Sequence, residues 1–169
     1  MTLDSYRILR TTIGWVGLLW SAVGLKRCTL PCINSTQALY KLELDKPCDE
    51  APEYDEQFLD ISRYLTDYLL GLKPIHKPLL DIKGTDFQTL VWSVTSFIPY
   101  GTTKTYSWVA YQIGKADSYR AVGQALKANP LPIFIPCHRV ISSGNGLGGY
   151  SGIEGVDTKE QLLKLEGYL

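Results

Sequence analysis

The stretch Thr105–Asn129 reads TYSWVAYQIGKADSYRAVGQALKAN and carries the clearest pattern of secondary structure in the chain. Its first part predicts a short helix, Tyr106–Ile113, which the threonine before it can cap and which Gly114 ends. A second helix begins at Asp117 or Ser118, either of which can cap it, and ends with the stretch itself. Two short helices joined by a tight turn have the outline of a helix-turn-helix, an outline that many all-helical domains share.

The second of these helices is thin. Small side chains recur along it, at Ala121, Gly123, Ala125 and Ala128. A thin helix can pack tightly against a neighbouring helix, or it can enter a narrow groove from which a bulky helix would be excluded. Composition alone leaves both interpretations open.

The residues before this pair predict another helix. Thr85 and Gln88 form a capping-box pattern, and Pro99 and Gly101 end the helix. Its apolar positions recur at helical spacing, at Phe87, Leu90, Val91, Val94 and Phe97. This half of the chain is therefore predicted to be mainly helical.

The residues after the pair form an apolar run with a reactive centre. Leu131–Ile141 reads LPIFIPCHRVI, and Cys137, His138 and Arg139 interrupt it. A buried cysteine is normally an inert thiol, whereas a neighbouring imidazole or cation favours the nucleophilic thiolate. Because adjacent side chains of an extended segment point opposite ways, a water or a bend in the chain is needed to connect the cysteine to the histidine.

The N-terminal part predicts strands followed by a helix. Short apolar segments punctuated by glycine over Tyr6–Leu30 predict a small antiparallel sheet. The acidic, proline-containing segment Asp45–Glu56 predicts a loop, and apolar residues at helical spacing over Phe58–Leu72 predict an amphipathic helix. The proline-rich segment Lys73–Pro78 is the predicted linker.

Composition excludes several classes of protein. No apolar run approaches the roughly 18 residues of a membrane span, and no secretion signal is evident, so we expect a cytoplasmic protein, or a nuclear one in a eukaryote. The four cysteines are then expected to be reduced thiols. A zinc site built from three of them with His76 is disfavoured, because the pair Cys28 and Cys32 has no matching second pair.

The charge of the chain is balanced overall but not locally. Lysines and arginines number 17, as do aspartates and glutamates, whereas residues 100–151 hold five basic residues and one acidic one, a local charge of 5 − 1 = +4. Such a stretch can bind phosphates, although a mild excess of charge is also typical of a solvated face.

A family resemblance joins these pieces. Pro136–Val140, which reads PCHRV, resembles the active-site signature of the O6-alkylguanine-DNA alkyltransferases. Further segments are similar to the family's recognition helix, turn, substrate loop and closing helix, in that order: Arg120–Gly123, Asn129–Pro130, Gly149–Gly152 and Leu162–Gly167. Together they span roughly Thr85 to Gly167. The N-terminal half resembles the family only loosely.

The resemblance implies a fold and an activity. The expected fold class is α/β, with a small ribonuclease H-like α/β domain at 1–78 and a mainly helical, winged helix-turn-helix domain at 79–169 that binds DNA and transfers the alkyl group. The implied function is DNA repair. The family binds the minor groove of double-stranded DNA, flips O6-alkylguanine out of the stack and moves its alkyl group irreversibly onto a cysteine. No cofactor and no metal ion is expected. We expect a monomer, and cooperative binding on DNA is left open.

The resemblance also implies roles for single residues. Cys137 is the implied nucleophile and alkyl acceptor, His138 the base that acts through a water, and Glu166 the group that orients the imidazole. Arg120 would fill the space left by the flipped base. Tyr106 would help to rotate the nucleotide and donate toward the base; its alternative is plain core packing.

The remaining candidates divide into three groups. The implied substrate contacts are Val140, Tyr150, Ser151 and Gly152. The implied DNA contacts besides Arg120 are Thr105, Ser118, Tyr119, Ala121 and Gly123. Asn129 and Arg139 are expected to support the structure of the site.

The sequence departs from the family's pattern in places, and two rival functions remain. Tyr119 stands where the family usually has a small residue, and a longer loop around Gly155–Asp157 affects the register of Glu166. A non-catalytic sensor of alkylguanine is one rival, although such relatives replace the residue at Cys137. A helix-turn-helix transcription factor is the other, although the thin helix offers few side chains for reading the major groove.

Overall fold

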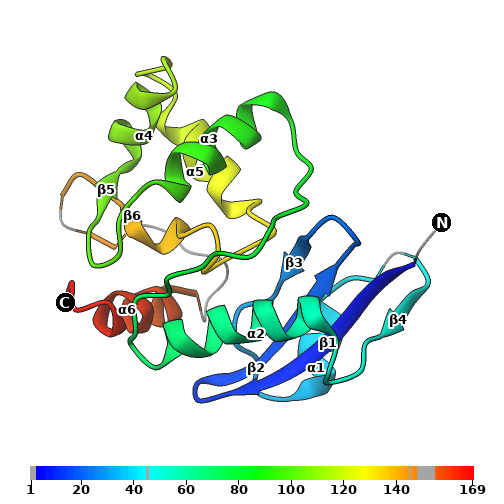
Figure 1. Ribbon diagram of the computed structural model, residues 1–169. Coiled ribbons are helices and arrows are strands. Elements are labelled where there is room, and N and C mark those ends of the chain that lie inside the picture. The colour runs from blue at the N-terminus through cyan, green and yellow to red at the C-terminus, as the bar shows by residue number, and fades with distance from the viewer. Residues whose placement is uncertain (1–2, 45, 145, 148–154) are drawn as a thin grey trace. The chain divides into compact units, whose positions relative to one another are not determined.

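The computed structural model describes residues 3–44, 46–144, 146–147 and 155–169. The chain divides into two compact units, Met1–Ile82 and Lys83–Leu169 (Figure 1). The first unit contains a four-stranded sheet and two helices, and the second contains helices with a two-stranded sheet, so the fold is mixed α/β. No helix in the described part of the chain is both long enough and apolar enough to cross a membrane.

The sheet of the first unit has the order β3-β2-β1-β4. Its strands are β1 (Asp4–Thr11), β2 (Gly14–Trp20), β3 (Leu25–Cys28) and β4 (Cys48–Glu50). The first three are antiparallel, as predicted for Tyr6–Leu30. Strand β4 is a correction, because it lies inside the predicted loop and pairs in parallel with β1.

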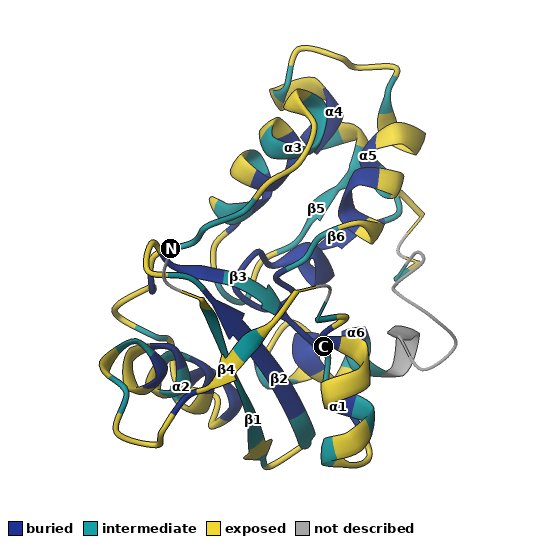
Figure 2. Cartoon of the chain, turned by 90° about the vertical axis from the view of Figure 1, so that its right-hand side faces the viewer, coloured by how far each residue is buried: buried dark blue, intermediate teal, exposed yellow. Residues whose placement is uncertain are grey.

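Two helices cover opposite faces of this sheet (Figures 1 and 2). They are α1 (Ser35–Lys41) and α2 (Glu56–Leu69). A Cβ atom on Gly17 of β2 would lie 2.6 Å from Leu42 at the end of α1, whereas Trp20 of β2 stacks on Phe58 of α2 with ring centroids 6.1 Å apart. Residues 17 and 20 face opposite ways in a strand.

One of these two helices was predicted from the sequence. Helix α2 matches the predicted amphipathic helix, and Asp55 caps it by accepting from the Phe58 N–H. Of the predicted apolar positions, Leu72 is exposed, because the chain turns at Gly71 with a positive φ of 76°. Helix α1 was not predicted, although Asn34 is its cap.

The second unit follows the predicted order of helices. Its elements are α3 (Asp86–Ser96), β5 (Lys104–Thr105), α4 (Tyr106–Gln112), α5 (Tyr119–Lys127), the 3-10 helix η1 (Cys137–Arg139), β6 (Val140–Ile141) and α6 (Gly155–Leu165). The capping box of Thr85 and Gln88 is confirmed, as is the Thr105 cap, whose hydroxyl accepts from the Trp108 N–H at 3.0 Å. Ser118 is the N-cap residue of α5, but its side chain makes no capping hydrogen bond.

The predicted apolar face of α3 was partly wrong. Leu90 and Phe97 are exposed, whereas Trp92 is buried and its Nε1 donates to the Ala125 carbonyl of α5 at 2.9 Å. A buried indole needs a hydrogen-bond acceptor, and the end of α5 supplies one. The contact joins α3 to α5 and so fixes the helix that the sequence singles out.

Candidate active site

Cys137 begins the 3-10 helix η1 at the end of a buried turn. Every residue from Leu131 to Val140 is buried, and Cys137 is 7% exposed. The Ile135 N–H donates to the Leu131 carbonyl at 2.8 Å, and Ile133 within the turn has a positive φ of 74°. A β-branched residue rarely adopts that conformation, so the turn is held by its surroundings.

Asn129 ties this turn to the sulfur atom. Its Nδ2 donates to the Ile135 carbonyl at 3.0 Å and to Cys137 Sγ at 3.2 Å, while its Oδ1 accepts from the Leu131 N–H at 2.9 Å. We expected Asn129 only to brace the turn. The contact with the sulfur adds a chemical task, because a donor aimed at Sγ stabilises a thiolate.

The histidine beside the cysteine contacts Glu166. His138 is fully buried, and its Nε2 lies 2.7 Å from Glu166 Oε1. The structure thus places Glu166 against His138, although the longer loop had left the register of Glu166 uncertain in the sequence. Their partner is Arg139, which donates from Nε and Nη2 to the same carboxylate at 2.9–3.1 Å.

The protonation states follow from this cluster. Burial by itself would raise the pKa of Glu166, but hydrogen bonds from His138 and Arg139 and their charges lower it to about 2. Burial lowers the pKa of His138, and the contact with Glu166 opposes that shift only in part. An ionised carboxylate can only accept, so His138 Nε2 carries the proton and Nδ1 keeps the lone pair that a base needs.

Arg139 holds several elements at once. Besides Glu166, its guanidinium donates to the Ile98 carbonyl after α3 at 2.7 Å and lies over the Tyr100 ring, 5.6 Å from the centroid. The Gly101 N–H also donates to Glu166 Oε2 at 2.9 Å. The carboxylate is therefore saturated with donors, and removing Arg139 would leave it buried and undercompensated.

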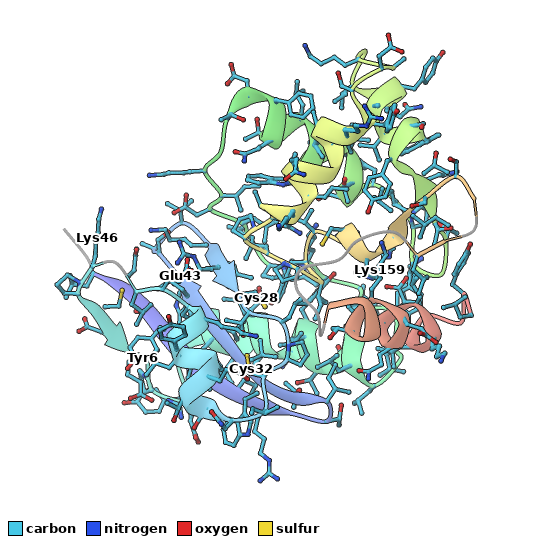
Figure 3. The ribbon with its side chains drawn as sticks, turned by 180° about the vertical axis from the view of Figure 1, so that it is seen from behind. Tyr6, Cys28, Cys32, Glu43, Lys46 and Lys159 are labelled. Carbon is cyan, nitrogen blue, oxygen red and sulfur yellow. The ribbon has the colours of Figure 1, made fainter. Side chains whose placement is uncertain are left out.

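Lys159 is a site residue that the sequence reasoning missed. It is fully buried on α6, and its Nζ donates to the Val140 carbonyl at 2.6 Å and lies 5.9 Å from the Tyr106 ring centroid. Figure 3 shows it reaching from α6 toward η1 and β6. Burial lowers the pKa of Lys159 to about 8, against the opposing influence of Cys137.

A helical pattern could have revealed Lys159. It stands seven residues before Glu166, and Leu162 and Leu163 lie between them, so all four share one face of α6 and its end. All four side chains are buried. A lysine on the buried face of a helix, in line with a predicted site residue, is the signal.

Tyr106, a predicted catalytic residue, and Val140, a predicted substrate contact, lie beside this lysine. Tyr106 opens α4, and burial and then Cys137 raise its pKa, so the phenol is protonated at neutral pH. Val140 is buried, and its N–H donates to the Cys137 carbonyl. Its own carbonyl accepts from Lys159. The other three predicted substrate residues, Tyr150, Ser151 and Gly152, lie outside the described residues.

The predicted DNA-contacting residues cluster at the start of α5. Arg120 and Ala121 are exposed, Tyr119 is 43% exposed, and Ser118 and Gly123 are half-buried. Thr105 is half-buried, and its hydroxyl already caps α4. The opposite face of α5 is buried, at Val122, Ala125 and Leu126. Helix α5 therefore packs on one side and presents the small and basic side chains on the other.

The other cysteines form no comparable site. Burial, with a contribution from Cys32, raises the pKa of Cys28 far above its ordinary value, so this thiol is unreactive. Figure 3 shows both cysteines in the first unit. Within the described ranges, no three or more His, Cys, Asp or Glu side chains gather closely enough to hold a metal ion, and His76 is exposed near Asp60.

Comparison with known proteins gives one consistent result. Residues 86–168 match the family described as 6-O-methylguanine DNA methyltransferase, DNA binding domain. The chain is 40% identical to the methylated-DNA–protein-cysteine methyltransferase of Methanosarcina acetivorans over 162 residues, which cover 96% of this chain and 97% of the relative. The constitutive enzyme of Bacillus subtilis is 41% identical over 107 residues, or 63% of this chain and 64% of the relative.

Solved structures agree with these matches. The structure of Mycobacterium tuberculosis OGT in complex with DNA has a TM-score of 0.80 and 34% identity, covering 96% of this chain and 92% of that one. Together with the buried Cys137 and its neighbours, these likenesses define a class of protein, the cysteine-dependent alkyltransferases that act on DNA. The chain belongs to the methylated-DNA–protein-cysteine methyltransferase family, and its activity is DNA repair by alkyl transfer.

Proposed function

We propose that the chain takes the alkyl group of O6-alkylguanine in double-stranded DNA onto Cys137, once per molecule. The observation that carries the assignment is the contact of Asn129 Nδ2 with Cys137 Sγ at 3.2 Å, beside a histidine oriented by Glu166. A sulfur atom held next to a donor and a neutral base is equipped to react as a thiolate.

The chemistry balances without a cofactor. His138 Nδ1 takes the thiol proton through a water, and the thiolate attacks the alkyl carbon. The bond from that carbon to O6 breaks, its electron pair stays on the base, and Tyr106 donates toward the base as the charge develops. The proton released by the thiol then returns to Tyr106, the donor. The products are guanine and a thioether on Cys137.

The proposal includes base flipping through α5. A stacked guanine hides its alkyl group, so the nucleotide must leave the duplex. Arg120 and Ala121 are exposed on α5, and Arg120 fills the space that the base vacates. Small residues on the exposed face of α5 allow the backbone to approach the minor groove closely.

Finer features of the fold belong to the same proposal. We regard the first unit as ribonuclease H-like and α4–α5 as the helix-turn-helix of a winged domain, with β5–β6 at the position of the wing. The functional division into domains 1–78 and 79–169, the monomeric state and the cytoplasmic or nuclear location are also proposed. Substrate contacts of Val140, Tyr150, Ser151 and Gly152 complete it.

Separating binding from chemistry tests this function. Cys137→Ser removes the nucleophile and leaves α5 and its basic side chains unchanged, so affinity for duplex DNA with O6-methylguanine should persist while transfer is lost. Fluorescence anisotropy would measure binding, and release of the methyl group from labelled DNA would measure transfer. Residual transfer in this variant would contradict the assignment of Cys137, and it would have to come from another cysteine.

A sensor of alkylguanine without catalysis is the second candidate function. It predicts the same binding but no chemistry in the unmodified chain. The buried thiol with its hydrogen bond from Asn129 favours catalysis. The transfer assay on the wild-type protein decides between the two.

A further inference from the structure

Tyr119 is a predicted DNA-contacting residue to which the proposed reaction assigns no step. It is the first residue of α5, its side chain is 43% exposed, and the next residue is Arg120. An exposed aromatic ring contributes little to the core. It is also the one aromatic side chain on α5, whose other exposed residues are Arg120, Ala121, Gln124 and Lys127.

The two side chains lean together. The Arg120 guanidinium carbon lies over the Tyr119 ring, 5.4 Å from its centroid. Consecutive residues on a helix point about 100° apart and do not face each other by default. The contact therefore reflects an attraction between the flat cation and the ring rather than the geometry of the helix.

This contact restricts the side chain that has to act. A free arginine samples many rotamers, and inserting it into a duplex costs the entropy of choosing one. A ring that already stacks on the guanidinium removes part of that freedom before DNA binds. Preorganisation of this kind strengthens binding without any new contact to the ligand.

We propose that Tyr119 is a positioning residue that holds Arg120 ready to occupy the space left by the flipped base. The inference rests on the proposed function, because it assumes that task for Arg120. Tyr119 acts through the arginine, so its contribution should vanish when the arginine is absent. It should also be confined to duplex substrates, since free O6-benzylguanine needs no flipping.

The test compares two substrates in four variants. Transfer rates are measured with duplex O6-methylguanine and with free O6-benzylguanine for Tyr119→Phe, Tyr119→Leu, Arg120→Ala and the Tyr119→Leu/Arg120→Ala pair. An exposed cation–π contact corresponds to about a two- to fivefold effect. We expect Tyr119→Leu to lower the ratio of duplex rate to free-base rate by that factor, and Tyr119→Phe, which keeps the ring, to preserve the ratio.

The control is Tyr111→Leu, which removes an exposed tyrosine from α4, 71% exposed against 43% for Tyr119. This variant should keep the wild-type ratio. In the background of Arg120→Ala, Tyr119→Leu should cause no further loss. A full additional loss there would overturn the proposal, as would a wild-type ratio in Tyr119→Leu. An unchanged duplex rate in Arg120→Ala alone would instead overturn the flipping role under the proposed function.

Discussion

Asn129 is the residue on which the geometry of the nucleophile most depends. Its amide makes hydrogen bonds to the Leu131 N–H, the Ile135 carbonyl and Cys137 Sγ. A turn residue with three partners in a buried segment cannot be replaced by a side chain that lacks both a donor and an acceptor. The sequence indicated the turn from Asn-Pro, but the contact with sulfur depends on the path of the chain after it.

Asn129→Ala should therefore weaken both the fold and the reaction. Leaving the buried Leu131 N–H unpaired costs about 1–3 kcal/mol of unfolding free energy, which urea titration would measure, whereas the Ile135 carbonyl keeps its hydrogen bond from the Cys137 N–H. Transfer from free O6-benzylguanine should slow at least tenfold, because the thiolate loses its donor. The control is Asn34→Ala, which removes the N-cap of α1. It should lower the free energy of unfolding by about 1 kcal/mol and leave transfer unchanged. Equal transfer rates in both variants would show that Asn129 only braces the turn.

The Glu166 carboxylate makes the stability of the protein depend on pH. Its folded pKa of about 2 lies below the ordinary 4.5, so the unfolded chain binds the proton more tightly. Stability from this group is then full above about pH 4.5 and is lost as the pH falls toward 2. Glu166→Gln should show a smaller loss of unfolding free energy than the wild type between about pH 5 and pH 3. Parallel losses would mean that the carboxylate is not ionised in the folded protein.

The same glutamate also governs the reaction. Glu166→Gln and His138→Ala should each raise the pH at which transfer from free O6-benzylguanine is half-maximal, because the proton acceptor is removed or misoriented. The double variant should be little slower than the slower single variant, since residues acting as one unit are not additive. Losses that multiply, with an unchanged pH profile, would limit Glu166 to packing the end of α6.

Helix α5 is the element that most clearly serves something outside the fold. Gly123 lies in its middle, where glycine costs about 1 kcal/mol relative to alanine. A Cβ atom there would meet only Tyr106, at 3.8 Å, which is an ordinary contact. The folded chain therefore does not require glycine at this position.

Gly123→Ala should consequently separate stability from repair. The free energy of unfolding should rise by about 0.5–1 kcal/mol, and the protein should unfold at a higher temperature, because alanine has a higher helix propensity than glycine. Repair of duplex DNA should nevertheless slow, because the added methyl group keeps the helix away from the groove. The rate of transfer from free O6-benzylguanine is the reference for this comparison. Unchanged duplex repair would contradict the idea that the small residue at this position serves close approach to DNA.

Local sequence signals predicted elements well where a capping residue and a periodic pattern coincided. The capping box at Thr85 and the cap at Thr105 both have the expected hydrogen bonds. Helix α1 and strand β4 were missed because each is short, and β4 depends on pairing with β1, a partner far away in the sequence. The predicted face of α3 was rotated because Trp92 was not considered as a buried residue with a carbonyl partner.

The site as a whole depends on contacts between distant parts of the second unit. Cys137 and Glu166 are 29 residues apart (166 − 137), and only the return of α6 to η1 brings the carboxylate to His138 and Arg139. Local patterns do not predict such a return, and the family resemblance supplied it. Lys159 arrives on the same helix and was overlooked, because a lysine usually marks a solvated face.

The central claim is a single transfer to one cysteine. The measurement is the intact mass of the protein after incubation with excess duplex DNA containing O6-methylguanine, followed by peptide mapping. A thioether is stable, and nothing in the proposed chemistry removes it, so the mass should rise by one methyl group and the modified peptide should contain Cys137. Sustained turnover without modification, or a methyl group on Cys28, Cys32 or Cys48, would contradict the account.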